Sequence, residues 1–219
     1  LSRCGARICG AGGSTIIIEG VHHLIGCEHT VIPDRIAAAT YLTAAAITGS
    51  TLTVSSVIPE HLAPILPVFE ESGCSMDLYD KAVRIAAPQR LRRVKSVRTM
   101  PYPGFPTDAQ APVMAMTTVA DGTSMFVENI FESRYKHVGE LLRLGANIKV
   151  EGRVAVVEGV DHLSGASVEA SDLRGGAALV VAGLAAQGIT EVKGLHHLDR
   201  GYECIEKNLA SLGADIRRV

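Results

Sequence analysis

The sequence predicts an α/β fold made of three similar units packed around one core. Three times along the chain, an aspartate opens an alanine-rich apolar stretch that ends in a glycine, and β-forming residues follow. The three aspartates are Asp34, Asp108 and Asp172, and the glycines are Gly49, Gly122 and Gly188. The repeat is roughly 55 to 70 residues long, which exceeds a solenoid repeat and suits a small α/β subdomain. Helices that alternate with strands indicate the α/β class.

The first repeat, residues 34–99, shows how each element is identified. Its aspartate is a good helix N-cap, and the alanine-rich residues 36–46 favour a helix. Residues 51–54 alternate between polar and apolar side chains, which is typical of a half-buried strand. Residues 61–72 have apolar side chains at helical spacing, and two prolines among them predict a kink.

The same order recurs in the second repeat, residues 100–170, and in the third, residues 171–219. Further helices are predicted at residues 111–120, 135–144, 175–186 and 202–212. Further strands are predicted at residues 76–78, 83–85, 125–127, 146–150, 154–157, 191–192 and 214–218, with linkers at 89–99 and 158–170. Periodicity alone leaves open whether the helices fill the middle and the sheets lie outside.

Composition narrows the class of protein. The 219 residues suit one large domain, or one domain with a remnant of a second. The chain is 47% hydrophobic but 4% aromatic, so its core must be aliphatic. A net charge of −2 with scattered signs argues against a nucleic-acid or anionic-membrane partner, and no apolar run has the length of a membrane span. The five cysteines, an odd number without paired metal-type spacing, predict free thiols in a reducing compartment.

The first residues resemble the end of a repeat. Residues 1–8 read like residues 209–216, and both contain a Leu-x-x-x-Gly-Ala-x-Ile-type pattern or a close variant of it. The chain starts with Leu1 rather than methionine. We therefore expect a piece of a longer gene product that begins inside a repeat.

Asp108 is the first candidate catalytic residue. It follows a loop, residues 101–107, that contains three prolines and a glycine. Such a loop is rigid and presents a carboxylate at a fixed position, as a general base must be presented. The alternative is that Asp108 is only a helix N-cap, because Asp34 and Asp172 occupy equivalent places.

Arginines mark a second candidate feature. Arg134 and Arg200 each stand just before a predicted helix, where the guanidinium and the helix dipole together favour an anion. For Arg200 the alternative is a local ion pair with Asp199 or Glu203.

Two further groups of residues are candidates for a site. Asp172 and Arg174 add an acid and a base at the opening of the third repeat, and the alternative for them is an N-cap with a surface ion pair. Neighbouring histidines on a strand point to opposite faces, so we expect no metal site.

Four motifs resemble the C-terminal half of the UDP-N-acetylglucosamine 1-carboxyvinyltransferases, a family of enolpyruvyl transferases. In order, they are Phe105-Pro-Thr-Asp108-x-Gln, Ile130-Phe-Glu-x-Arg134, Asp172-Leu-Arg174 and His197-Leu-Asp-Arg200-Gly-Tyr-Glu203. The resemblance implies an inside-out α/β barrel of three βαβαββ units. It also implies that residues 1–33 are the tail of a first domain and residues 34–219 a second domain.

The resemblance implies a reaction in which the enolpyruvyl group of phosphoenolpyruvate moves to the 3-hydroxyl of UDP-N-acetylglucosamine. That reaction is the first committed step of peptidoglycan precursor synthesis, with no cofactor, in the cytoplasm. By this resemblance Asp108 is the base beside the hydroxyl and Arg200 engages phosphoenolpyruvate. Ile130 gives a backbone contact to the UDP-sugar, Arg134 lies near it, and Asp172 with Arg174 forms an acid–base pair beside the same cleft.

The family's remaining catalytic groups lie in its first domain, so the resemblance implies that this chain needs that domain and is inactive alone. Two alternatives stay open. The chain is a non-catalytic half-protein or binding module, or its activity is that of 5-enolpyruvylshikimate-3-phosphate synthase. The Phe-Pro-Thr-Asp and Asp-Arg-Gly-Tyr-Glu segments argue against the second alternative.

Overall fold

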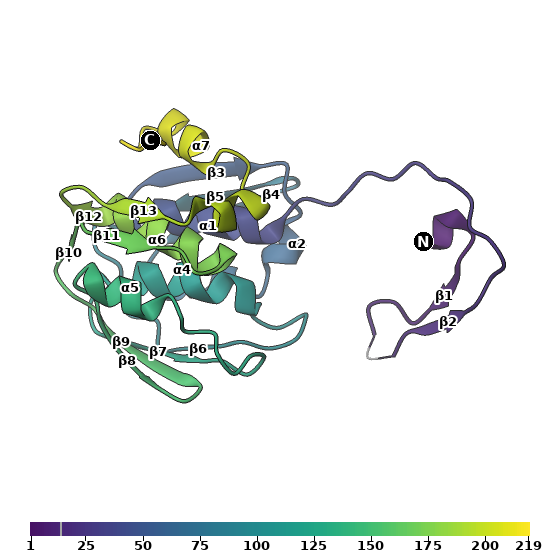
Figure 1. The fold of residues 1–219 in the computed structure, drawn as a ribbon, viewed down its shortest axis with the longest axis horizontal. Helices are drawn as coiled ribbons and strands as arrows, with labels where there is room; N and C mark the ends of the chain where they lie inside the picture. The colour runs from purple at the N-terminus through teal and green to yellow at the C-terminus, as the bar shows by residue number, and fades with distance from the viewer. Residues whose placement is uncertain (14) are drawn as a thin grey trace. The chain divides into compact units, whose positions relative to one another are not determined.

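The structure is a computed structural model that describes residues 1–13 and 15–219 and divides into two units, Leu1–Ile32 and Pro33–Val219. The first unit, purple in Figure 1, contains the 3₁₀ helix η1 (Ser2–Cys4) and the antiparallel strands β1 (Arg7–Cys9) and β2 (Ile17–Glu19). In the same unit the Sγ atoms of Cys4 and Cys27 lie 3.2 Å apart, and both thiols are free.

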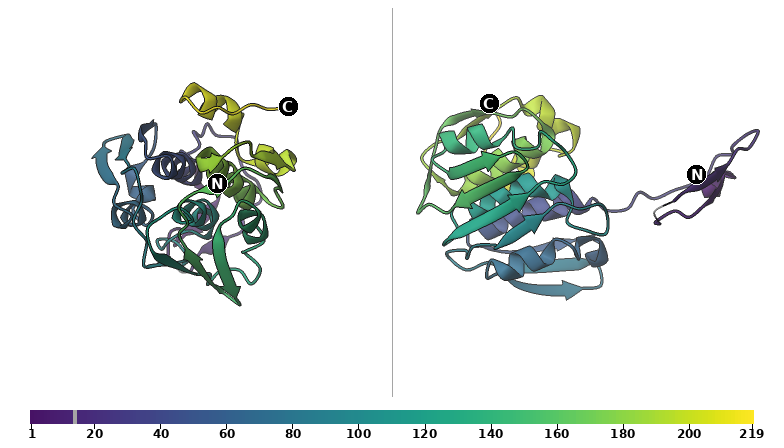
Figure 2. Two further views of the ribbon diagram at one scale, coloured as in Figure 1. Left: turned by 90° about the vertical axis from the view of Figure 1, so that its left-hand side faces the viewer. Right: turned by 90° about the horizontal axis from the view of Figure 1, so that it is seen from below.

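Three helices form the centre of the second unit: α1 (Arg35–Ile47), α4 (Thr107–Thr117) and α6 (Leu173–Ala185). Each of them packs against the other two, and in the left view of Figure 2 the strands lie around them. Their alanine- and glycine-rich sequences are buried on nearly all sides, which is typical of a helix at the centre of a core. The expected inside-out arrangement, with helices inside and sheets outside, is confirmed.

The second and third repeats start earlier than residues 100 and 171, because each begins with a strand that precedes its central helix. The sheets belong to these successive repeats. In the first, β3 (Thr51–Ser55), β5 (Ala82–Ala86) and β4 (Ser75–Tyr79) are antiparallel and adjacent in that order. In the second, the order is β6 (Ser96–Arg98), β7 (Thr123–Val127), β9 (Val154–Glu158) and β8 (Asn147–Glu151). The third repeat has two parallel pairs, β10 (Leu163–Ser164) with β12 (Ala186–Gln187) and β11 (Ser167–Glu169) with β13 (Glu191–Lys193). Across the described ranges these sheets do not join into a closed barrel.

The second and third repeats each contain a crossover connection between two parallel strands. Strands β6 and β7 are parallel and flank α4 in sequence, and β11 and β13 are parallel and flank α6. A parallel pair joined through a helix is the βαβ unit. The expectation that residues 89–99 and 158–170 are only linkers is therefore wrong, because they contribute β6, β10 and β11.

The shorter helices differ from the expected ranges, and two of them begin later than expected. The predicted kink at residues 61–72 separates α2 (Pro59–Leu62) from α3 (Leu66–Glu71). Helix α5 (Val138–Arg143) starts after Tyr135, whose hydroxyl lies 3.2 and 3.1 Å from two carbonyl oxygens at the sheet. Helix α7 (Ile205–Ser211) follows the 3₁₀ helix η2 (Leu195–Arg200). Cys204, at φ 45°, interrupts the helical backbone just before α7.

The strand predicted at residues 214–218 is absent from the structure. Strands β4 and β8 of the earlier repeats each pair with the strand that follows them, β5 and β9. Residues 214–218 have no such neighbour in the part of the chain that the structure describes, and a strand needs a hydrogen-bonded partner. Among the described helices, none has the length and apolarity that crossing a membrane requires.

Candidate active site

Asp108 is not the N-cap of its helix. Helix α4 begins at Thr107 and its N-cap is Pro106, so Asp108 lies in the first turn. By contrast, the side chains of Asp34 and Asp172 cap α1 and α6, each accepting from two backbone N–H groups. The alternative that Asp108 is a plain cap is therefore wrong, and its carboxylate is free to bind other partners.

The carboxylate of Asp108 lies between two arginines. Its Oδ1 accepts a hydrogen bond from Arg134 Nη2 at 2.8 Å, and its Oδ2 accepts one from Arg174 Nη2 at 3.0 Å. The Asp108 side chain is 41% exposed, whereas Arg134 and Arg174 are 19% and 14% exposed. Two guanidiniums around one carboxylate leave a net positive charge, which favours an anionic ligand beside an acid that a substrate can reach.

Arg134 comes from the segment between β7 and α5, and Glu128 holds the start of that segment. Glu128 is 1% exposed, and its Oε1 accepts from the backbone N–H groups of Ile130 and Phe131 at 2.8 and 3.1 Å. The same carboxylate accepts from the hydroxyls of Thr99 and Thr107, at 2.8 and 3.0 Å. Because Thr107 precedes Asp108, this buried carboxylate ties the segment of Arg134 to the start of α4.

Sequence reasoning missed Glu128. A glutamate directly after a β-strand and two residues before a motif isoleucine was the only local signal. Because the carboxylate of Glu128 binds the backbone N–H of Ile130, only the backbone carbonyl of Ile130 remains for a ligand. No described backbone N–H donates to that carbonyl. Arg134 is also supported from the side, because its guanidinium carbon lies 5.4 Å from the centroid of the Phe131 ring.

Asp172 and Arg174 do not form a pair with each other. The carboxylate of Asp172 accepts from the N–H groups of Arg174 and Gly175 at 3.0 and 2.8 Å, and thus caps α6. The guanidinium of Arg174 extends instead to Asp108 and to the hydroxyl of Tyr202. The alternative that Asp172 is an N-cap is confirmed. The surface ion pair between Asp172 and Arg174, which was part of that alternative, does not form.

Arg200 lies at the end of η2 and is exposed. Its side chain makes no hydrogen bond or ion pair to any residue that the structure describes. Asp199, its expected local partner, is held by Arg218 at 3.0 and 2.6 Å, and this hydrogen bonding lowers the pKa of Asp199. The local ion pair of Arg200 with Asp199 or Glu203 is therefore wrong, and the structure does not bring Arg200 into contact with Asp108.

His137 lies between the segment of Arg134 and the start of α6. Its side chain is 1% exposed, and a Cβ added at Gly175 would lie 3.0 Å from the His137 Cβ. Burial lowers the pKa of His137 to about 4, and the opposing attraction of Asp172 does not offset it. The imidazole is therefore neutral in the folded protein at pH 7.

Acidification from pH 7 to 4 should destabilise the protein through His137. The unfolded histidine takes up its proton near pH 6.5 and the folded one near pH 4, so stability falls as pH drops through that window. The contribution amounts to about 3 kcal/mol. Urea unfolding from pH 7 to 4 should show a shallower loss for His137→Gln than for wild type. Equal pH slopes for the two proteins would contradict this assignment.

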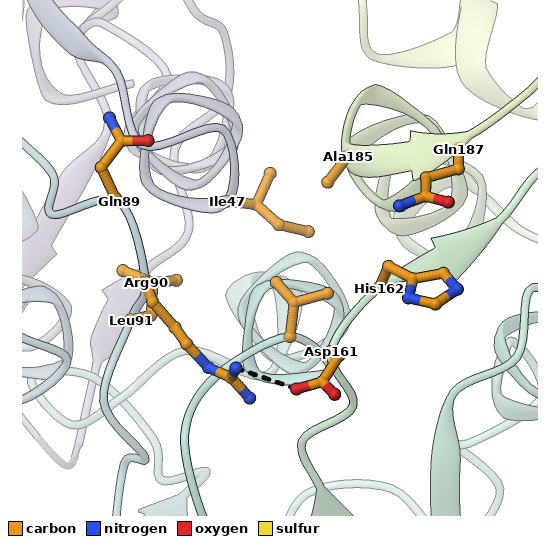
Figure 3. A pocket seen from close by; sticks show the side chains of 9 residues that line it. Ile47, Gln89, Arg90, Leu91, Asp161, His162, Ala185 and Gln187 are labelled. Carbon is orange, nitrogen blue, oxygen red and sulfur yellow. Dashed lines mark hydrogen bonds and ion pairs between the residues drawn. The ribbon is translucent and has the colours of Figure 1, made fainter.

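A separate cavity lies at the other end of the central helices. It lies beside Ile47 and Ala185, the last residues of α1 and α6 (Figure 3). Its volume is about 280 Å³. Arg90 and Asp161 form a 2.9 Å ion pair in its wall. Asp108 and Arg174 lie at the opposite ends of their helices, so this cavity is not the candidate active site. The described residues contain no cluster of three or more histidine, cysteine or acidic side chains suited to a metal ion.

Comparison with known proteins adds independent information. Residues 1–209 match the family described as EPSP synthase (3-phosphoshikimate 1-carboxyvinyltransferase). UDP-N-acetylglucosamine 1-carboxyvinyltransferase 2 of Caldanaerobacter subterraneus subsp. tengcongensis is 52% identical over 219 residues, which are 100% of this chain and 52% of that protein. The UDP-N-acetylglucosamine 1-carboxyvinyltransferase of Prochlorococcus marinus is 54% identical over 218 residues, 50% of its own length. The chain thus spans about half the length of these relatives.

Two solved structures are similar to this chain. The enolpyruvyl transferase NikO from Streptomyces tendae has a TM-score of 0.85 and 30% identity, over 98% of this chain and 51% of its own. An EPSP synthase from Acinetobacter baumannii has a TM-score of 0.71 and 17% identity, over 100% of this chain and 54% of its own. The second likeness concerns the fold alone.

Proposed function

The chain belongs to the EPSP synthase (3-phosphoshikimate 1-carboxyvinyltransferase) family, and from this premise we propose that it is the second domain of an enolpyruvyl transferase acting on UDP-N-acetylglucosamine. One observation carries the proposal: relatives named for that acceptor match the whole chain at 52% and 54% identity. The EPSP synthase from Acinetobacter baumannii is 17% identical. We further propose that the first unit, Leu1–Ile32, is the tail of the first domain.

In the proposed reaction, the 3-hydroxyl of the acceptor sugar attacks phosphoenolpyruvate, the enolpyruvyl group is transferred and phosphate leaves. Asp108 is the proposed base for the hydroxyl proton. Its support is geometric: the carboxylate is partly exposed, stands in the first turn of α4 and is held from two sides. Fixed orientation of a base toward the reacting group is what general-base catalysis requires.

The two arginines shape what Asp108 does. Each carboxylate oxygen accepts one guanidinium hydrogen bond and keeps a further lone pair for a substrate hydroxyl. The two guanidiniums hold the carboxylate in a fixed orientation, with those lone pairs directed away from the arginines. Once the proton has moved, the pair of guanidiniums is less neutralised and attracts the anionic groups of the substrates more strongly.

The remaining proposed contacts to the substrates lie at the same end of the central helices as Asp108. Ile130 offers its carbonyl to the UDP-sugar, and Arg134 lies beside it. Asp172 supports the site by fixing the start of α6, from which Arg174 reaches Asp108. Arg200 is the proposed phosphoenolpyruvate ligand, and its support is an exposed guanidinium without a protein partner in the described chain.

The cellular role follows from the substrates. Addition of enolpyruvate to UDP-N-acetylglucosamine opens peptidoglycan precursor synthesis, so we propose a role in cell-wall formation and thereby in cell shape and division. We propose that the reaction takes place in the cytoplasm.

The proposal is tested by supplying the missing part. The chain is joined to the portion of the Caldanaerobacter relative that it does not match, and this fusion is called the joined enzyme. The joined enzyme should release phosphate from phosphoenolpyruvate when UDP-N-acetylglucosamine is present, and not with shikimate 3-phosphate. The 219-residue chain alone should release none above background, because half of the cleft is missing.

Each alternative has its own outcome in this assay. Preference for shikimate 3-phosphate would identify the sister activity. A joined enzyme that folds but uses neither acceptor would favour a non-catalytic binding module. Activity of the unjoined chain with UDP-N-acetylglucosamine would show that the first domain is not required.

A further inference from the structure

Tyr202 connects the third repeat to the first at the same end of the helices as Asp108. It stands between η2 and α7 and is 4% exposed. Its hydroxyl oxygen lies 2.9 Å from Thr40 Oγ1 on α1 and 3.3 Å from Arg174 Nη1 on α6. In the sequence Tyr202 belongs to the motif of residues 197–203, and no role was predicted for it.

The direction of these hydrogen bonds follows from counting protons. Thr40 has one hydroxyl proton and donates it to the carbonyl oxygen of Ile36 at 2.9 Å. Towards Tyr202, Thr40 therefore acts as the acceptor, and Tyr202 donates its own proton to Thr40. The lone pairs of the Tyr202 oxygen are then left to accept from Arg174, which has only donors.

The result is a fixed orientation of the Arg174 guanidinium. Its Nη1 donates to Tyr202 and its Nη2 donates to Asp108 Oδ2, so a planar, rigid group is held at two points. The Tyr202 ring also lies 5.8 Å from the guanidinium carbon. Burial lowers the pKa of Arg174, but Tyr202 and Asp108 outweigh it and the pKa is raised overall. The cation is therefore permanent.

We propose that Tyr202 is a positioning residue that aims Arg174 at Asp108, and so sets the geometry of the base without touching the substrate itself. The inference rests on the proposed role of Asp108. The contacts run from α1 through Tyr202 and α6 to α4, so they join all three repeats. Because Tyr202 lies two residues after Arg200, it also links the segment of Arg200 to Asp108.

The first test uses the 219-residue chain and needs no activity. Tyr202→Phe keeps the ring and removes only the hydroxyl. If Tyr202 acts on Asp108 through Arg174, Tyr202→Phe and Asp108→Asn should couple in urea unfolding, changing the equilibrium constant by at least about twofold relative to additivity. Tyr41→Phe is the matched control, because it removes a hydroxyl bonded to Asn208 at 3.1 Å on the same helix as Thr40. Tyr41→Phe and Asp108→Asn should be additive.

The second test uses the joined enzyme. Tyr202→Phe should lower kcat about 10-fold, the size expected for one hydrogen bond to a charged group, with a smaller change in KM. Tyr41→Phe should leave both unchanged. Arg174→Lys should reproduce the Tyr202→Phe effect, because lysine lacks the two-point fork.

The outcomes separate the two proposals. An inactive wild-type joined enzyme would overturn the proposed function, while the unfolding cycle would still decide whether Tyr202 couples to Asp108. Additivity of Tyr202→Phe with Asp108→Asn would overturn the positioning role. So would an active joined enzyme in which Tyr202→Phe leaves kcat unchanged.

Discussion

Asp108→Asn should lower turnover of the joined enzyme by roughly 10²- to 10⁴-fold, the range for loss of a general base. Asparagine has the shape of aspartate and still offers one oxygen to an arginine, but it cannot take up the hydroxyl proton. It also presents an NH₂ group to one of the two guanidiniums, Arg134 or Arg174, both of which are donors only. The loss should therefore appear in kcat more than in KM.

Steady-state kinetics with both substrates varied checks this result. Circular dichroism and the urea midpoint of the variant should remain close to wild type, since Asp108 is partly exposed and does not cap its helix. A kcat within a few-fold of wild type would show that the proton is taken by another group.

Arg200→Ala should lower kcat/KM for phosphoenolpyruvate by roughly 10- to 100-fold, the range for hydrogen bonds to a charged group. The physical reason is that its guanidinium is exposed and has no protein partner among the described residues, so its charge is available to a ligand. Both a raised KM and a lower kcat are expected, because the contact contributes to binding and to orientation. Arg200→Lys should recover only part of the loss, since lysine cannot make the planar two-point contact.

Arg218→Ala is the matched control for Arg200→Ala. It removes a nearby arginine whose partner, Asp199, is known, and exposed ion pairs of this kind contribute little to stability. Its kinetics should resemble those of wild type. If Arg218→Ala and Arg200→Ala raised the KM for phosphoenolpyruvate equally, a general loss of positive charge would explain the effect and the specific role of Arg200 would be lost.

The sequence was sufficient for those features that depend on neighbours in the chain. Asp34 was expected as an N-cap, and an N-cap was the alternative for Asp172; both accept backbone hydrogen bonds, because capping is a local interaction. The break between α2 and α3 and the three central helices followed from proline geometry and from alanine-rich stretches. The repeat indicated three units around one core, and the family resemblance implied that the helices lie inside.

Long-range contacts were beyond local patterns. The partners of Asp108 lie 26 and 66 residues away, so no spacing rule brings Arg134 and Arg174 to the same carboxylate. The same holds for Tyr202, whose partner Thr40 is 162 residues away. Glu128 was missed because a buried glutamate without a cationic partner is unusual. Two of its four hydrogen-bond donors, the hydroxyls of Thr99 and Thr107, come from residues 29 and 21 positions earlier in the chain.

Element boundaries were predicted least well where tertiary contacts decide them. The helix expected from Tyr135 starts at Val138 because the tyrosine hydroxyl bonds back to the sheet. The helix expected from Tyr202 starts at Ile205, because the side chain of Tyr202 instead contacts α1 and α6. Propensity describes a residue's local preference, and these two positions show that preference overridden by side-chain contacts.

In the proposed function only Asp108, the second of the three repeated aspartates, carries chemistry, and one paired measurement tests this directly. Turnover and unfolding free energy are measured for Asp108→Asn and Asp34→Ala in the joined enzyme. Asp34 caps α1 through the N–H groups of Ile36 and Ala37, at 2.7 and 3.2 Å. Asp34→Ala should cost about 0.5–2 kcal/mol of stability and little turnover, and Asp108→Asn should show the reverse. Equal losses of turnover in the two variants would contradict the claim.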